Sequence, residues 1–346
     1  MRKKIFSILQ YVIFLGGGLF LVWWQLRDMT PEGVKEFKDA FNTANYWLII
    51  PIVIMALASH LSRSMRWKLL MEQLGYKPKL KNVFAVTIVG YLANSAVPRL
   101  GEILKCTFLS RYEKLKVDKL VGTILVERTF DVLCYLIFIA ITVLIQISTI
   151  GEFIKEQFSI FASSSGMPVW AKLIIVVGCV IALFLLLKLL SRKYPNSGII
   201  IRTRNFFAGI VEGFRTIQRM KKKKLFIAHT IFIWSMYLLE IYVGFQAIEA
   251  TSGLGLKAAC SVLTMATLAM IITPSGIGTF PLLVRNTVMK YGIDKNIGNA
   301  FGWLIWGVST GIIIIAGIIC LAVLPYINRK KNEIDTGDTD QNIQPA

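Results

Sequence analysis

The chain has 346 residues, of which 55% are hydrophobic and 17% are charged, and its formal net charge is +19. Soluble proteins carry about 25% charged residues, and the apolar residues here come in blocks close to the roughly 20 that a bilayer-spanning helix needs. Composition therefore excludes a soluble globular protein and predicts an all-α, polytopic membrane helix bundle, with one membrane domain over residues 1–326.

Apolar segments recur along the whole chain. They cover residues 5–25, 46–62, 82–98, 119–147, 168–190, 225–249, 258–273 and 298–325. The first is too long for the apolar core of a signal peptide and lacks a small-residue cleavage site, so we expect a span that ends at the interfacial Trp23 and Trp24. After the last segment, residues 327–346 are polar and predict a short, disordered cytoplasmic tail.

Basic residues gather in some connections and avoid others. The basic stretches are 2–4, 63–81, 111–119, 192–224 and 329–331. The positive-inside rule places these stretches, and hence both termini, on the cytoplasmic side of an inner membrane. Eight plain spans would put 111–119 outside. The conflict disappears if the third and seventh segments return to the side they entered, which gives six full spans and two opposed re-entrant hairpins.

Two polar interruptions mark the tips of these hairpins. NSAVPRLGE, residues 94–102, contains Pro98 and Gly101, and TPSGIGTFP, residues 273–281, contains Pro274. Opposed broken helices build the midplane sites of inverted-repeat transporters, and irregular backbone at membrane depth is tolerated only beside protein or a water-filled cavity. The sequence therefore predicts an inverted repeat with a polar cavity at the tips. The alternative is a kinked helix that ends at a polar interface.

Ionisable and polar residues within the apolar segments are candidates for function, because charges are costly at membrane depth. They are Asn94, Arg99, Glu102, Glu127, Arg128, Asp131 and Glu240. A guanidinium matches phosphate geometry, which favours a ligand role for Arg99 and Arg128. The carboxylates Glu127 and Asp131 fit a structural ion-pair network equally well. Glu240 is either functional or a hydrogen-bonded core glutamate.

The second interruption predicts an anion site without a charged side chain. Gly276 and Gly278 permit a tight turn, and a helix starting near Thr279 would aim its free N–H groups at the cavity. An ordinary loop turn is the alternative.

A basic segment at 199–224 differs from the other connections. It carries an apolar stripe at helical spacing and ends in Lys221, Lys222, Lys223 and Lys224. We expect a cytoplasmic amphipathic helix that binds anionic head groups. A simple positive-inside loop explains the lysines but not the stripe. His60 and His229 are isolated, so the sequence predicts no metal site, and we also expect no cofactor and no nucleic-acid partner.

Five stretches in a fixed order resemble the flippase-like membrane region of lysylphosphatidylglycerol synthases, over about residues 5–326. They are RSMRWKLLMEQLG (63–75), NSAVPRLGE, SRYEK (110–114), VERTFD (126–131) and TPSGIGTF. The matching residues are Asn94, Pro98, Arg99, Gly101, Glu102, Glu127, Arg128, Asp131, Pro274, Gly276 and Gly278. The resemblance implies a bacterial or archaeal membrane protein whose relatives move modified or glycosylated lipids.

This sequence departs from that family pattern in three ways. Many members have one more residue between the proline and the arginine of PRLGE, and many have a glutamate where Pro281 stands. No aminoacyltransferase domain follows the membrane region. The resemblance therefore implies lipid handling rather than lysyl transfer.

The expected function is to translocate, or to assist translocation of, an anionic phospholipid or lipid-linked saccharide. Its phosphate would lie between the two arginines of the candidate set and the Gly276–Thr279 helix start. The sequence has no GxxxxGK[ST] loop for ATP, so transport would use a gradient, a downhill lipid or a partner. One alternative is a membrane enzyme with Glu102 and Glu127 or Asp131 as acid and base. Another is an accessory subunit of a separate lipid-modifying enzyme. The oligomeric state is left open.

Overall fold

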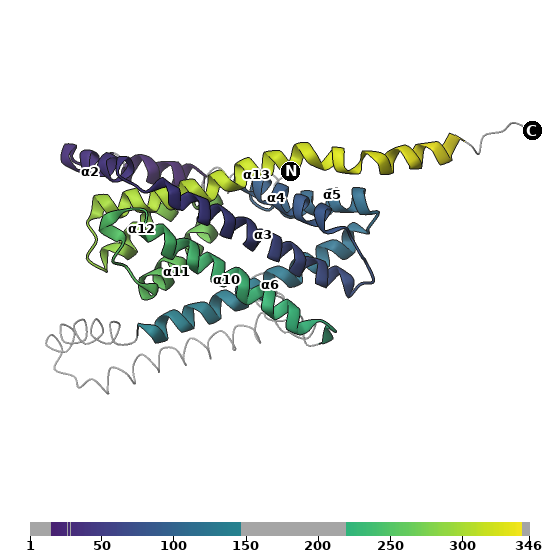
Figure 1. Ribbon diagram of the computed structural model, residues 1–346, viewed down its shortest axis with the longest axis horizontal. Coiled ribbons are helices and arrows are strands. Elements are labelled where there is room, and N and C mark those ends of the chain that lie inside the picture. The colour runs from purple at the N-terminus through teal and green to yellow at the C-terminus, as the bar shows by residue number, and fades with distance from the viewer. Residues whose placement is uncertain (1–14, 26, 28, 147–218, 341–346) are drawn as a thin grey trace, which may run out of the picture. The chain divides into compact units, whose positions relative to one another are not determined.

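The computed structural model describes residues 15–25, 27, 29–146 and 219–340, with side chains up to Arg329 (Figure 1). Contacts divide the chain into two compact units, residues 1–125 with 220–346, and residues 126–219. The described part of the second unit is essentially 126–146, the later part of one long helix. The architecture below is that of the first unit.

Every regular element in the described ranges is helical. In chain order they are α2 (Pro31–Asn42), α3 (Ile49–Glu72), α4 (Leu80–Ala96), α5 (Leu100–Glu113), α6 (Val117–Ile145), α10 (Lys223–Phe245), α11 (Leu256–Ile272), α12 (Thr279–Met289) and α13 (Lys295–Asp340). Short 3-10 turns occupy Tyr46–Leu48, Glu249–Thr251 and Pro274–Gly276, and residues 15–25 are also helical. This is the all-α membrane bundle that composition predicts.

Four helical stretches are long and apolar enough to cross a membrane: Tyr46–Glu72, Val117–Ile145, Lys223–Phe245 and Lys295–Arg329. They coincide with the second, fourth, sixth and eighth apolar segments. The predicted fifth span, 168–190, lies outside the described residues, and so do residues 1–14 of the first.

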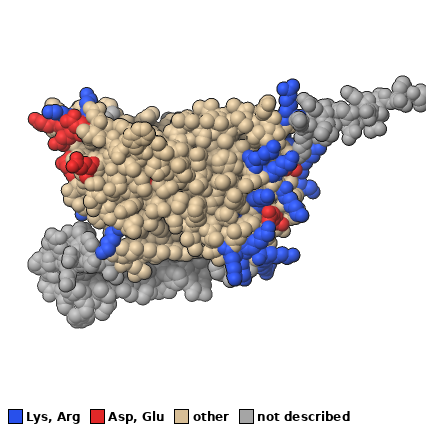
Figure 2. Space-filling model, in the orientation of Figure 1, with Lys and Arg blue, Asp and Glu red and all other residues tan. Residues whose placement is uncertain are grey.

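One end of the first unit is rich in lysine and arginine (Figure 2). At this basic end the Lys222 ammonium pairs with the Glu72 carboxylate at 2.8 Å, which joins the start of α10 to the end of α3. There too the Glu113 carboxylate, on α5, accepts from the Lys79 N–H at 3.2 Å. Asn82, near the start of α4, donates to Asn328 of α13 at 3.0 Å.

At the opposite end of the first unit, hydrogen bonds connect the start of α13 to α2 and the start of α3 to the end of α10. Asn296, in the first turn of α13, donates to Glu36 of α2 at 2.8 Å. The N–H of Asn45, ahead of α3, donates to the carbonyl of Ala247, just after α10, at 2.8 Å. Helices α3, α10 and α13 therefore each run from one end of the unit to the other.

Helices α4 and α5 form a hairpin that opens at the basic end, since the start of α4 and the end of α5 meet at Glu113. Helices α11 and α12 form a second hairpin, which opens at the opposite end, where the hydroxyls of Ser261 and Tyr291 lie 2.9 Å apart. Helices α4 and α11 each have 17 residues, about 25 Å at 1.5 Å per residue, so both hairpins turn back before reaching the far end.

Two runs of helices repeat the same order in opposite directions. Helices α3, α4 and α5 have 24, 17 and 14 residues, and α10, α11 and α12 have 23, 17 and 11. A long helix follows each run. Helix α3 runs toward the basic end and α10 runs away from it. This arrangement is the inverted repeat that the two opposed interruptions predict.

Helix α13 differs from the expected element at its C-terminal end. The helix extends to Asp340, whereas the sequence predicts a disordered tail from 327. Extending an existing helix avoids the cost of nucleation, which explains how a polar segment continues it.

The first hairpin is held together by a backbone contact between glycines. A Cβ on Gly101 of α5 would lie 1.9 Å from the carbonyl oxygen of Gly90 on α4 and 2.7 Å from Asn94. No side chain fits such a contact without moving one helix off the other. Gly101 is thus a packing residue as well as part of the interruption.

We expect Gly101→Ala to lower the free energy of unfolding by about 1–3 kcal/mol, the cost of overpacking. Thermal unfolding in detergent is the measurement. The matched control is Gly122→Ala on α6, where no atom lies within 4 Å of the added Cβ, and which should be neutral or stabilising because alanine favours helix. Equal stability of the Gly101 variant and the wild type would contradict the packing.

The opposed hairpins also predict a labelling pattern. In a cysteine-free background, Lys79→Cys and Lys116→Cys react with an impermeant maleimide from one side of the membrane, and Asp294→Cys reacts from the other. The reason is that 79 and 116 flank the first hairpin at the basic end, while 294 follows the second hairpin. Labelling of 79 and 116 from opposite sides would show that the third segment crosses.

Candidate functional site

The first tip breaks the helix with a short extended and left-handed stretch. After α4, Val97 is extended, with φ −138° and ψ 118°, and Arg99 is left-handed, with φ 68°. The side-chain Oδ1 of Asn94 accepts the Gly101 N–H at 2.8 Å, and the side-chain Nδ2 donates to Glu102 Oε1 at 3.3 Å. Asn94 therefore caps α5 across the break, which gives the polar residues of NSAVPRLGE a structural reason.

The second tip repeats this backbone 176 positions later. Thr273 is extended like Val97, with φ −122° and ψ 152°, and a proline and the left-handed Ser275, with φ 52°, follow it. The hydrogen bonds also correspond. The N–H of Val97 donates to Ala93 at 2.8 Å and that of Thr273 to Ala269 at 3.1 Å. Arg99 and Ser275 are thus equivalent residues of the repeat.

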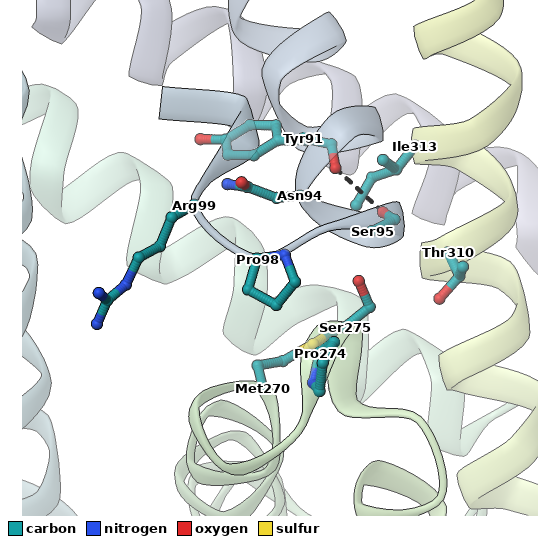
Figure 3. Close-up of a pocket in the computed structure, with 10 residues that line it drawn as sticks. All are labelled: Tyr91, Asn94, Ser95, Pro98, Arg99, Met270, Pro274, Ser275, Thr310 and Ile313. Atoms are coloured by element: carbon teal, nitrogen blue, oxygen red, sulfur yellow. Dashed lines mark hydrogen bonds between the residues drawn. The ribbon is translucent and has the colours of Figure 1, made fainter. Parts of the chain in front are cut away.

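The two tips meet at a pocket of about 270 Å³ (Figure 3). Its lining is Tyr91, Asn94, Ser95, Pro98 and Arg99 from the first hairpin, Met270, Pro274 and Ser275 from the second, and Thr310 and Ile313 from α13. Trp306 of α13 donates to the Ser275 carbonyl at 2.8 Å and fixes that tip. The pocket lining therefore contains one cation together with amide and hydroxyl groups, and the helices around it are apolar.

Arg99 supplies the positive charge of the pocket lining. Its side chain is exposed and makes no hydrogen bond or ion pair with other residues that the structure describes. In Figure 3 it leaves the tip on the side away from Ser275 and Thr310. The guanidinium is therefore accessible and has no partner among the described residues.

The predicted helix-start residues Gly276, Gly278 and Thr279 follow the pocket residue Ser275 but are not part of the pocket lining. The Gln25 amide donates to the Gly278 carbonyl at 2.8 Å, and a Cβ on Gly278 would lie 2.3 Å from the Gly18 carbonyl oxygen. The Thr279 hydroxyl bonds that of Thr273 at 2.5 Å. The N-terminal helix, residues 15–25, thus covers the start of α12, and the structure brings Ser275 to the pocket instead.

The remaining candidates fall outside the pocket or outside the described residues. Glu127, Arg128 and Asp131 lie on α6 in the second unit, so their approach to the first tip stays a prediction. Glu240 lies within α10, where its Oε1 is buried and has no hydrogen-bond partner in the described part of the chain.

The predicted amphipathic helix is described only at its end. Residues 199–218 lie outside the described part, and Lys221 to Lys224 are exposed at the start of α10. In the described ranges, no three histidine, cysteine or acidic residues are grouped as metal ligands.

Buried cations near the basic end escaped the sequence reasoning. Arg63 and Arg66 were counted with a basic connection, but both are buried on α3, because that helix continues ten residues beyond the apolar segment. Arg66 donates to the Thr230 hydroxyl at 3.3 Å. Lys105 lies 4.1 Å from the ring centroid of Trp67. The spacing of Arg63, Arg66 and Trp67, at i, i+3 and i+4, was the available signal for one helix face.

Opposed helical hairpins between apolar spans define a polytopic helical membrane protein with an internal inverted repeat. The chain belongs to the family of the lysylphosphatidylglycerol synthase TM region, whose family model matches residues 7–317. It is similar to the UPF0104 membrane protein MJ1595 of Methanocaldococcus jannaschii, with 22% identity over 328 residues, 86% of this chain and 91% of that protein. No solved structure matches the chain.

Asn94 gives a direct test of the first tip. We expect Asn94→Ala to cost about 0.5–2 kcal/mol of stability, the usual loss for a helix cap, and to speed hydrogen exchange of the Gly101 amide. Ser95→Ala is the control, because the Ser95 hydroxyl bonds only the Tyr91 carbonyl of its own helix. Unchanged exchange at Gly101 would contradict the cap.

Proposed function

We propose that the protein translocates, or assists translocation of, an anionic phospholipid or lipid-linked saccharide across the cytoplasmic membrane. The observation that carries the proposal is the pocket between the two hairpin tips, with the exposed Arg99 at its mouth. Both termini would face the cytoplasm. In this proposal the protein is a transporter and not an enzyme. Its partners are membrane lipids, whose anionic head groups it binds.

The charge and backbone of Arg99 support a ligand role. A charged group at membrane depth costs about 2.5–3.5 kcal/mol on insertion scales, and a left-handed non-glycine residue costs roughly 1–2 kcal/mol more. Arg99 bears both costs without an ion pair to the described residues. A phosphate would offset them through paired N–H···O bonds.

The size of the pocket supports a head group as the transported part. About 270 Å³ lies just below the range of small-molecule sites, roughly 300–1,000 Å³. Such a volume accepts a phosphate with a small substituent, while the acyl chains stay in the bilayer. The hydroxyls of Ser275 and Thr310 are available to hydroxyl groups of glycerol or a sugar.

The inverted repeat supports alternating exposure of this pocket. The first hairpin opens at the basic end and the second at the opposite end, so equivalent movements of the two tips would expose the pocket to opposite sides. Reconstitution into liposomes with a fluorescent anionic lipid distinguishes transport from the accessory-subunit and enzyme alternatives. Transport moves the head group unchanged, an enzyme yields a new product, and an accessory subunit does neither.

Replacement of Arg99 by glycine should change transport and stability in opposite directions, which separates a role in function from a role in folding. Arg99→Gly removes the cation and also relieves the left-handed strain, so we expect stability to be kept or raised by up to about 1 kcal/mol. Transport should fall about tenfold or more, since a hydrogen bond to a charged group contributes about 1.5–3 kcal/mol. Transport should fall less in Arg99→Lys than in Arg99→Gly, because lysine keeps the positive charge and loses only the planar guanidinium.

Lys114→Gly is the matched control for this experiment. Lys114 is an exposed lysine, left-handed with φ 54°, at the basic end and away from the pocket. Its replacement also removes one positive charge and relieves the same kind of strain. We expect full transport in this variant. Equal losses of transport in the two glycine variants would assign the effect to net charge and overturn the role of Arg99.

A further inference from the structure

An apolar groove lies between α3 and α10, away from the hairpin tips. It has a volume of about 400 Å³ and is lined by Ala58, Leu61, Ser62, Met65, Leu225, Ala228, His229 and Phe232. Both helices are candidate membrane spans, and Leu61, Leu225 and Phe232 are 37%, 46% and 41% exposed. The groove is therefore bordered by exposed apolar side chains on two candidate membrane spans.

The polar groups in the groove satisfy each other. The Ser62 hydroxyl and His229 Nδ1 lie 2.9 Å apart, across the two helices. The Ser62 hydroxyl and His229 Nδ1 therefore need no polar partner from an occupant, and the rest of the lining is apolar. The chemistry of the groove thus fits a hydrocarbon chain rather than water or a polar ligand.

Cations continue the groove toward the basic end. The lining residues of α3 follow helical spacing, and one turn beyond Met65 the same face presents Lys68. On the other side of the groove, the exposed Lys221 lies in the turn just before α10. The ion pair of Lys222 with Glu72 joins the two walls at this end. Lys68, Lys221 and Lys222 thus outnumber the Glu72 carboxylate at the basic end of the two helices, which leaves a net positive charge there.

We propose that this groove binds one anionic phospholipid, with an acyl chain between α3 and α10 and the phosphate between Lys68 and Lys221. The apolar groove matches the acyl chain of such a lipid, and the lysines at one end of the groove match its phosphate. The site is separate from the pocket between the tips, and it holds whether or not that pocket transports lipid. A lipid in this place links the two spans that lead the two halves of the repeat.

The experiment reads occupancy inside the groove. The protein carries Leu225→Cys in a cysteine-free background, in detergent, and dioleoylphosphatidylglycerol is titrated against the rate of maleimide modification. We expect the anionic lipid to protect the cysteine and dioleoylphosphatidylcholine to protect it far less. The double variant Lys68→Gln and Lys221→Gln should raise the half-protecting concentration about 25-fold, at about fivefold per lysine near a membrane surface.

Two further variants decide the outcome. Ala228→Phe fills the groove and leaves every lysine in place, so protection should weaken at least tenfold. The double variant Lys116→Gln and Lys119→Gln removes two exposed lysines elsewhere at the basic end and should leave protection unchanged. The proposal is overturned if this control weakens protection as much as the groove lysines do. Unchanged protection in Ala228→Phe, or equal protection by phosphatidylcholine, would overturn it as well.

Discussion

The arrangement depends on satisfying the backbone where two helices break between apolar spans. Each unsatisfied N–H or C=O group in hydrocarbon costs several kcal/mol, so a break persists only where other groups take over. At the first tip Asn94 does this for the start of α5. At the second tip the Trp306 indole and the Gln25 amide bond the carbonyls of Ser275 and Gly278. Each tip is thus fixed by side chains, and the pocket lies where these fixed tips meet.

The two tips share a backbone but not a chemical character. Arg99 and Ser275 hold equivalent left-handed positions, yet only the first carries a charge. The second tip has three more residues before its returning helix, and the N-terminal helix covers them. Val97 in the first tip is 43% exposed, and no such cover lies over it in the described residues. The half of the repeat that carries the cation is therefore also the half whose tip is open to a ligand.

The sequence was informative where local chemistry decides the structure. Each interruption combines a proline and glycines with polar residues inside an apolar segment, which predicts a helix break, and the basic 111–119 loop disfavours eight plain spans, so both hairpins and their opposed directions could be predicted. Long-range packing decides the rest. No local pattern around Gly278 shows that Gly18 and Gln25 cover it, so the packing of the N-terminal helix on the start of α12 could not be predicted. Arg66 was misplaced because hydropathy ends a span at the first arginine, whereas the Phe226 ring, 5.5 Å away, and the Thr230 hydroxyl accommodate it inside.

The contacts of the first hairpin are concentrated away from its tip. At its base the amides of Asn82 and Asn328 donate to each other at 3.0 Å in both directions, which fastens α4 to α13. One turn beyond Glu102, Lys105 is held against Trp67, whose indole donates to the Thr123 hydroxyl at 2.9 Å. Each such bond contributes about 1 kcal/mol, and a desolvated cation–π contact about 2 kcal/mol. Near the tip, the corresponding hydrogen bonds are those of the Asn94 side chain to Gly101 and Glu102. The two helices come closest at Gly90 and Gly101, so a change that opens the pocket would cost least if it moved residues 95–99 and left the Asn94 cap, the glycine contact and the base of the hairpin in place.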